Sequence, residues 1–174
     1  MAGWAEFAHG PAEVGAGPGT GGGAGVWAPF EPGAAALAEA GERLLSAPPA
    51  GINLLGTVSP TGRPRIHPFM PRVVDGRLWA FIVSGSPKER DLERRPYTIH
   101  TRPAEKDEEF WVSGHARRIE EPEVVERLAT AMSWARPDHE ALFEFDLDMA
   151  GWTIWLDFGT PKHRPQHHRW RART

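Results

Sequence analysis

The amino-acid sequence predicts a mainly β (α+β) fold, in which an antiparallel barrel of six or seven strands is flanked by two or three helices. An Asp75-Gly76 dipeptide separates two apolar runs, which is a strong local signal for a β-hairpin. Apolar and polar residues alternate over 143–149 and again over 152–158, as in strands that bury one face. Strand and helix patterns do not alternate along the chain, so a parallel sheet is not expected.

The first predicted helix covers residues 32–47 and leads into the first strand. Alanine dominates this stretch, a proline stands at its start, and three leucines share one face, Leu37, Leu44 and Leu45. Pro48-Pro49 ends the helix. Residues 52–59 then predict a strand, which a turn at 59–62 connects to the central hairpin.

The central hairpin consists of the predicted strands 64–74 and 77–83. The second strand is apolar on both faces, which indicates burial on two sides. The first strand contains Pro68 and Pro71, whose missing N–H groups would point to opposite edges. At least one of them must therefore lie at a bulge, at a strand end or where the ladder is open. A flat ligand with a polar edge, ordered water or a bulge would each satisfy such an open ladder.

The remaining elements follow from local signals. A short helix begins at 86–89 and continues to residue 95, and strands are predicted over 97–101 and 110–119. Glu120-Glu121-Pro122 opens a further helix with apolar residues in helical register. The two alternating runs near the end are predicted to form a hairpin that turns at Ala150-Gly151.

Composition narrows the class of protein. At 174 residues the chain is long enough for one domain with a sizeable core. A net charge of −3 gives no electrostatic case for binding nucleic acid or a membrane, and no apolar run reaches the roughly 18 residues of a membrane span. No secretory signal is recognised and there is no cysteine, so a cytoplasmic location is expected.

Three segments are expected: an N-terminal segment with a glycine-rich linker (1–32), the barrel domain (33–160) and a basic C-terminal tail (161–174). The glycines at 21–25 follow no strand and lack a Gly-Lys-Ser/Thr ending, which favours a linker over a phosphate loop. The tail combines five basic residues with three histidines. These charges are too few for a specific nucleic-acid arm, and the histidines lack a carboxylate or thiol partner, so no metal site is predicted.

Ser86 and Lys88 allow two interpretations. Ser86 can cap the short helix, with Pro87 in its first turn and Glu89 completing a capping box. Alternatively, the helix N-terminus and Lys88 can bind an anion such as a phosphate, although Glu89 would oppose an anion placed close by. The residues alone favour the cap.

Four segments, taken in order, resemble the split-barrel flavin-binding proteins related to pyridoxamine 5'-phosphate oxidase, in the small form abundant in actinobacteria. They are residues 57–68, 75–79, 86–92 and 109–117. The resemblance implies a split β-barrel that binds FMN as a homodimer, with the cofactor at the subunit interface. It also reverses the preference at the short helix, because the equivalents of Lys88 and Ser86 contact the flavin phosphate in similar proteins.

The resemblance implies further cofactor-binding residues. The strand beneath the isoalloxazine ring would contribute His67, Pro68 and Phe69, and its partner strand would flank the ring with Phe81 and Ile82. Without the resemblance, these residues would be core or dimer contacts. Trp170 is a further candidate, because relatives often fold a basic, tryptophan-containing end near the cofactor across the dimer interface.

The expected function is that of an FMN-binding oxidoreductase that acts on a small-molecule substrate or electron donor by hydride or electron transfer. We assign no catalytic side chain, and no Ser-His-Asp order or paired carboxylates support hydrolysis. Arg169-Trp170-Arg171 lacks the histidine of the oxidase's Arg-x-His substrate motif, which disfavours vitamin B6 oxidation. The alternatives are a split barrel that binds a deazaflavin or haem, and a flavin-binding protein without turnover.

Overall fold

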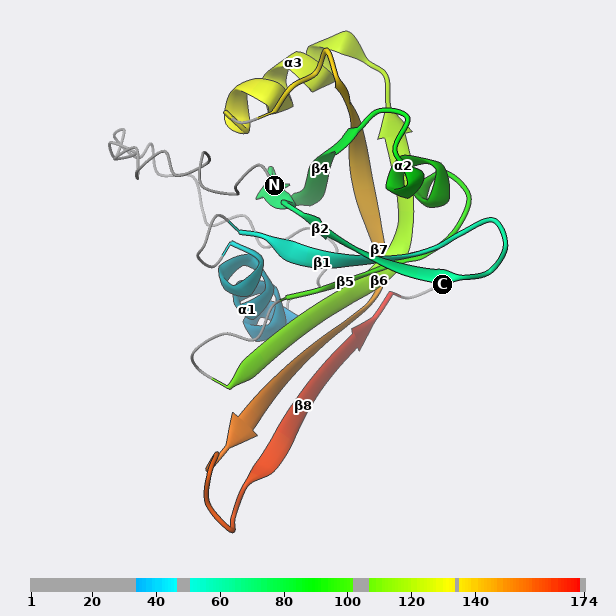
Figure 1. The fold of residues 1–174 in the computed structure, drawn as a ribbon. Coiled ribbons are helices and arrows are strands. Elements are labelled where there is room, and N and C mark those ends of the chain that lie inside the picture. Colours follow the sequence, from blue (N-terminus) through cyan, green and yellow to red (C-terminus); the bar gives the residue numbers. More distant parts are fainter. Residues whose placement is uncertain (1–33, 47–50, 102–106, 134, 173–174) are drawn as a thin grey trace, which may run out of the picture.

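The computed structural model describes residues 34–46, 51–101, 107–133 and 135–172, and within them it shows one antiparallel sheet of eight strands with three helices (Figure 1). The predicted mainly β split-barrel architecture is thus confirmed. The helices are α1 (Ala35–Leu45), α2 (Pro87–Leu92) and α3 (Pro122–Ala131). The strands are β1 (Asn53–Val58), β2 (Pro64–Phe69), β3 (Arg72–Val74), β4 (Arg77–Val83), β5 (Tyr97–His100), β6 (Glu108–Ile119), β7 (Glu140–Leu156) and β8 (Arg164–Arg171).

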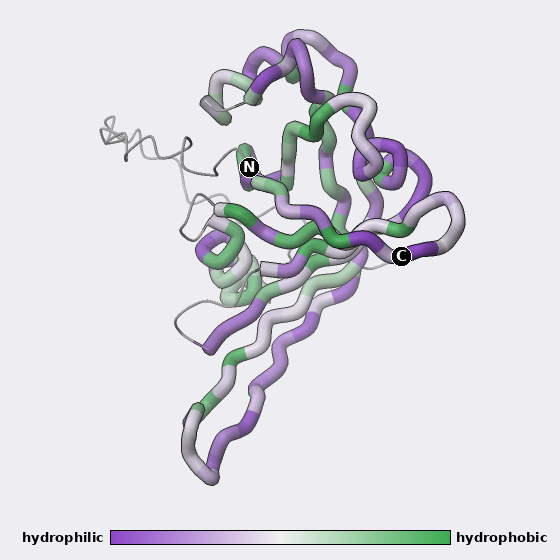
Figure 2. The backbone as a smooth tube through the Cα atoms, in the orientation of Figure 1, coloured by the Kyte–Doolittle hydropathy of each residue, from purple (hydrophilic) through white to green (hydrophobic). Residues whose placement is uncertain are grey.

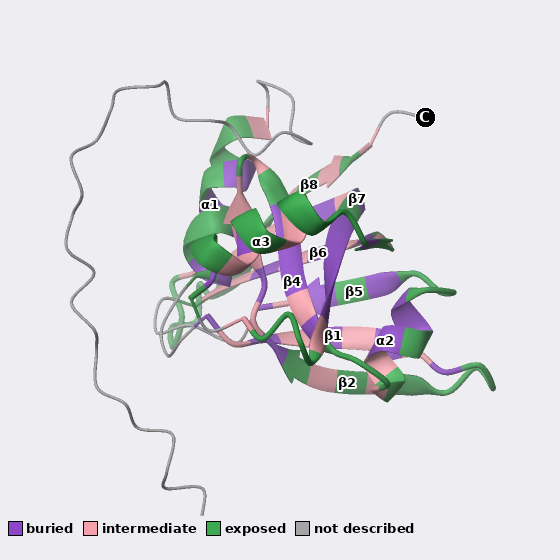
Figure 3. Ribbon diagram, turned by 90° about the horizontal axis from the view of Figure 1, so that it is seen from above, coloured by how far each residue is buried: buried purple, intermediate pink, exposed green. Residues whose placement is uncertain are grey.

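The sheet has the strand order β2-β1-β5-β6-β7-β4-β3, and β8 pairs with β7. The long strand β7 lies beside β6 over most of its length, while β4 pairs with residues 140–145 of β7 and β8 pairs with residues 149–156. Figure 1 shows β8 and the second half of β7 extending as a ribbon away from α3. Figure 2 shows that β8 is mainly hydrophilic, whereas buried residues concentrate along β4 and β7 in Figure 3.

The central hairpin resolves the problem of the two prolines. The predicted strand 64–74 is divided into β2 and β3, and Pro71 lies in the break between them. Pro68 lies in β2, an edge strand that pairs with β1 alone. The prediction that at least one proline lies at a strand end or open ladder is confirmed. Asp75 and Gly76 have φ values of 51° and 71°, as a tight type I′ hairpin turn requires.

Strand β4 is buried on both faces, as predicted. Leu78, Ala80 and Ile82 belong to the main hydrophobic core, which α1 covers. Trp79 and Phe81 point to the other face and pack in a second cluster with residues of α3. Strand β4 therefore contributes to both hydrophobic clusters found among the described residues.

The predicted hairpin at Ala150-Gly151 is wrong, because β7 runs without interruption from Glu140 to Leu156. Ser113 pairs with Met149 while the next residue, Gly114, pairs with Leu147, so Asp148 is an extra residue at a bulge. An extra residue shifts the alternation by one position. Odd-numbered residues such as Phe145 and Leu147 face the core before the bulge, and Ala150 and Trp152 face it afterwards. This shift imitates two separate strands in the sequence.

The segment expected as a basic tail contains β8, whose residues pair with β7 from Met149 to Leu156. The expected N-terminal segment 1–32, including its glycine-rich stretch, lies outside the described residues. In the described parts of the chain, none of the helices is long and apolar enough to cross a membrane.

Candidate functional site

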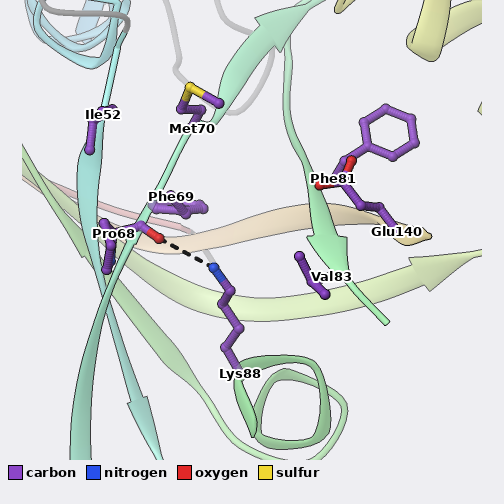
Figure 4. A pocket seen from close by; sticks show the side chains of 8 residues that line it. All are labelled: Ile52, Pro68, Phe69, Met70, Phe81, Val83, Lys88 and Glu140. Atoms are coloured by element: carbon purple, nitrogen blue, oxygen red, sulfur yellow. Dashed lines mark hydrogen bonds between the residues drawn. The ribbon is translucent and has the colours of Figure 1, made fainter. Parts of the chain in front are cut away.

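A cavity of about 230 Å³ opens where the break between β2 and β3 faces β4, α2 and the start of β7. Figure 4 shows the side chains that line it: Ile52, Pro68, Phe69, Met70, Phe81, Val83, Lys88 and Glu140. Six of these eight side chains are apolar, and the other two carry opposite charges. The cavity therefore suits a mainly apolar ligand that carries a charged group.

Lys88 extends from α2 into this cavity (Figure 4). Its Nζ donates a hydrogen bond of 3.2 Å to the backbone carbonyl of Pro68 on β2. Burial lowers the pKa of Lys88, and the nearby charge of Glu140 acts in the opposite direction. Among the described residues, no carboxylate forms an ion pair with Lys88. The ammonium group is thus positioned in the cavity and available to an anion.

Ser86 caps α2 and does not line the cavity. Its Oγ accepts a 3.3 Å hydrogen bond from the backbone N–H of Glu89, and Pro87 begins the helix, so the cap interpretation is confirmed. The Glu89 carboxylate accepts from the backbone N–H of Gly85 and pairs with Arg118 at 2.9 Å. This carboxylate adds negative charge beside the N-terminus of α2, so Lys88 is the better candidate for contact with an anion.

His67 does not line the cavity and belongs to a neighbouring polar network. Its Nε2 is 3.3 Å from the Thr57 hydroxyl, which donates at 2.9 Å to the carboxylate of Asp91. Asp91 is 1% exposed and also accepts from Arg65 at 3.1 Å. Burial lowers the pKa of His67 most, and the positive charge of Lys88 lowers it further. His67 is therefore electrostatically coupled to the cavity through Lys88.

The structure brings together four of the eight residues predicted for cofactor binding: Pro68, Phe69, Phe81 and Lys88. Ile82 lies in the main core with 1% exposure. Trp170 on β8 pairs with Ala150, ten positions along β7 from Glu140. Ten residues of β-strand span about 33 Å, so Trp170 lies far from the cavity of its own chain.

Sequence reasoning missed four cavity residues: Ile52, Met70, Val83 and Glu140. Ile52, Met70 and Val83 lie within predicted strands, 52–59, 64–74 and 77–83, so they could have been included. Glu140 precedes an alternating strand and has no motif around it, and only the pairing of β7 with β4 brings it to the cavity. No group of three or more metal-binding side chains occurs in the described part of the chain.

Comparison with known proteins gives a family match. The sequence model of the family described as "Pyridoxamine 5'-phosphate oxidase" matches residues 37–151, which is about two thirds of the 174-residue chain. A search of curated proteins found no match.

Several solved structures share the fold. A Clostridium acetobutylicum protein related to general stress protein 26 has a TM-score of 0.58 at 14% identity, covering 78% of this chain and 93% of its own. A pyridoxamine 5'-phosphate oxidase-related, FMN-binding protein from Nostoc punctiforme has a TM-score of 0.56 at 16% identity, covering 82% and 98%. A haem-binding protein from Mycobacterium smegmatis has a TM-score of 0.50 at 17% identity; the match covers 67% of this chain and spans about half (52%) of that protein. At identities this low, the structural matches show a common fold and nothing more.

Proposed function

This chain belongs to the pyridoxamine 5'-phosphate oxidase family, and from this membership we propose that it is an FMN-dependent oxidoreductase. The observation that carries the proposal is the placement of Lys88, a cation directed into an apolar cavity against the backbone of β2. A cofactor that is largely apolar and ends in a phosphate complements this arrangement. The chemistry supplied by such a flavin is hydride or electron transfer.

Each part of the cavity has a role in this proposal. Lys88 binds the phosphate through a charge-assisted hydrogen bond, for which it exchanges its bond to the Pro68 carbonyl. Phe69 and Phe81 provide apolar contact from two different strands, and Pro68 keeps the backbone of β2 open beside them. Ser86 acts indirectly, because its cap fixes the helix that carries Lys88.

A second copy of the chain completes the site in this proposal. The volume of about 230 Å³ lies below the roughly 300–1,000 Å³ of typical ligand pockets. Apolar side chains beside the cavity remain exposed: Ile66 is 72% exposed on the same face of β2 as Pro68, and Val83 in the cavity wall is 51% exposed. A partner packed over these residues would enclose the cofactor at a homodimer interface.

An absorbance spectrum of the purified protein, before and after titration with FMN, tests the proposal. We expect bound-flavin bands or saturable quenching of flavin fluorescence, followed by reduction with NADH, NADPH or another donor. Saturable binding of a deazaflavin or haem in place of FMN would overturn the FMN assignment and retain the fold. Tight FMN binding without turnover with any donor would overturn the enzymatic part.

Lys88→Ala provides the residue-level prediction. Loss of a charge-assisted bond should weaken FMN binding by roughly 1.5–3 kcal/mol. The dissociation constant can be measured by fluorescence quenching, with Lys162→Ala as a matched control, because Lys162 is an exposed lysine in the turn that precedes β8. An unchanged dissociation constant in Lys88→Ala would contradict the phosphate assignment.

A further inference from the structure

The cavity contains two opposite charges that do not neutralise each other directly. Lys88 and Glu140 both line it, yet they form no ion pair within 4.0 Å in the described structure. Figure 4 shows Lys88 directed to the Pro68 carbonyl, while Glu140 lies beside Phe81 on the other side of the cavity. A ligand in this space would therefore be exposed to the fields of both charges.

The position of Glu140 is fixed by the backbone on both sides of it. Glu140 is the first residue of β7 and pairs with Val83 of β4, which also lines the cavity. Its Oε2 accepts a 2.8 Å hydrogen bond from the backbone N–H of Arg136. These contacts hold the carboxylate in the cavity wall without a cationic side chain of the described structure to neutralise it.

The other carboxylates near α2 differ from Glu140 in this respect. Glu89 pairs with Arg118 at 2.9 Å, and Asp91 pairs with Arg65 at 3.1 Å. Neither of them lines the cavity. Glu140 is consequently the carboxylate whose charge a bound anion would experience most directly.

We infer that Glu140 is a specificity-determining residue, whose carboxylate counteracts Lys88 and limits the preference of the cavity for a phosphorylated flavin over an uncharged one. The inference rests on the proposed function, because it assumes that the flavin phosphate binds near Lys88. Repulsion between Glu140 and a phosphate acts on FMN and is absent for riboflavin, which has the same ring and no phosphate. The effect is consequently measurable as a ratio of two affinities.

The experiment compares dissociation constants for FMN and riboflavin in the wild type and in Glu140→Gln. Glutamine keeps an oxygen for the Arg136 N–H and removes the charge. We expect Glu140→Gln to bind FMN about three- to tenfold more tightly and to change riboflavin binding by less than about twofold. Asp138→Asn is the matched control, since it removes a carboxylate that is 70% exposed, lies two residues away and does not line the cavity.

Two outcomes separate the inference from the proposed function. If Lys88→Ala weakens FMN binding while Glu140→Gln leaves the FMN-to-riboflavin ratio unchanged, the proposed function stands and the role of Glu140 is overturned. If the wild type binds neither flavin, the proposed function fails together with the flavin preference assigned to Glu140, and the pKa of Lys88 then tests only whether Glu140 acts on Lys88.

That pKa is accessible because the chain has three lysines, Lys88, Lys106 and Lys162, whose ¹³Cε NMR signals can be assigned by substitution. Glu140→Gln should lower the pKa of Lys88, since the carboxylate favours the charged ammonium. A Lys88 pKa that is the same in wild type and Glu140→Gln would show that the two groups do not interact, and would overturn the inference.

Discussion

His67 connects the cavity to the buried polar network behind it. The single hydroxyl proton of Thr57 goes to Asp91, so the Nε2–H of His67 is the donor in its contact with Thr57. Asp91 is inaccessible to solvent and also pairs with Arg65. Such a network specifies one arrangement of β1, β2 and α2, because each buried polar group requires its partner.

The lowered pKa of His67 predicts a pH dependence of stability. In the unfolded chain the pKa of His67 is near the ordinary histidine value of about 6.5, and in the folded chain this pKa is lower. The unfolded state therefore binds the proton more readily, so the free energy of unfolding should fall as the pH drops from about 6.5 through the folded pKa. Urea denaturation of wild type and His67→Gln at several pH values measures this, since the variant should lack that part of the decrease.

A second measurement examines the cause of the His67 shift. The charge of Lys88 contributes to lowering the pKa of His67, so Lys88→Ala should raise it. Proton NMR titration of the histidine C–H signals would detect the change without any bound flavin. A His67 pKa that stays constant in Lys88→Ala would contradict coupling between the two residues.

Residues in local motifs were the ones that sequence reasoning could find. Ser86, Pro87 and Glu89 follow one another in the chain, so the cap of α2 is visible in the sequence and present in the structure. Glu140 and the network of Asp91 were missed because their surroundings come from distant strands. A helix residue such as Asp91 is ordinarily exposed, and no nearby residue indicates its burial.

At the scale of elements, the bulge between β6 and β7 depends on Gly114. A Cβ at Gly114 would lie 1.9 Å from the backbone oxygen of Asp146, which cannot move without disturbing the sheet. We expect Gly114→Ala to destabilise the protein by about 1–3 kcal/mol, as other overpacked sites do. Urea denaturation measures the loss.

Gly56→Ala is the matched control for this change. Gly56 also lies inside a strand, β1, and its added Cβ would meet its nearest atom at 3.4 Å, an ordinary contact. It should therefore retain nearly the wild-type stability. Equal stability of the two variants would show that the sheet relaxes around the bulge.

The strand predicted best was the one that had both a turn signal and a burial pattern in its own sequence. The expected strand 77–83 has the bounds of β4, because a tight turn starts it and apolar residues fill both faces. The expected hairpin at 150–151 failed because a bulge is a property of two strands, and only one of them is visible at that point in the sequence. β8 lacks any strand pattern, since it is rich in arginine and histidine, and it forms against the free edge of β7.

For the whole molecule, the exposed apolar surface beside the cavity predicts the oligomeric state. Ile66 is 72% exposed on edge strand β2 and would be covered in the proposed homodimer. Ile66→Asp should shift the protein from dimer to monomer, as measured by light scattering coupled to size-exclusion chromatography. The interface would otherwise bury a carboxylate that has no positively charged group to pair with. FMN affinity should fall with it, since in the proposed homodimer the partner would help to enclose the cofactor.

Ile66→Val is the control, because it keeps an apolar β-branched side chain at the same position and should remain dimeric. A wild-type protein that is monomeric at micromolar concentration, or an Ile66→Asp variant that stays dimeric, would contradict an interface at β2.

The family and the barrel were recognisable from four ordered segments, whereas the assembly depends on surfaces that no single segment describes.

The extra residue Asp148 determines which sequence positions of β7 face the core beyond the bulge and which face solvent. Loss of one codon there would leave the cavity end of β7, with Glu140 and Phe143, in its present orientation. Leu147 and Met149 would then be consecutive and could keep their partners Gly114 and Ser113, so Ala150 and Trp152 would still face the core. A single deletion at the bulge is therefore expected to preserve both faces of the β7–β8 ribbon, whereas a single deletion in a regular part of β7 would turn the residues beyond it to the opposite face.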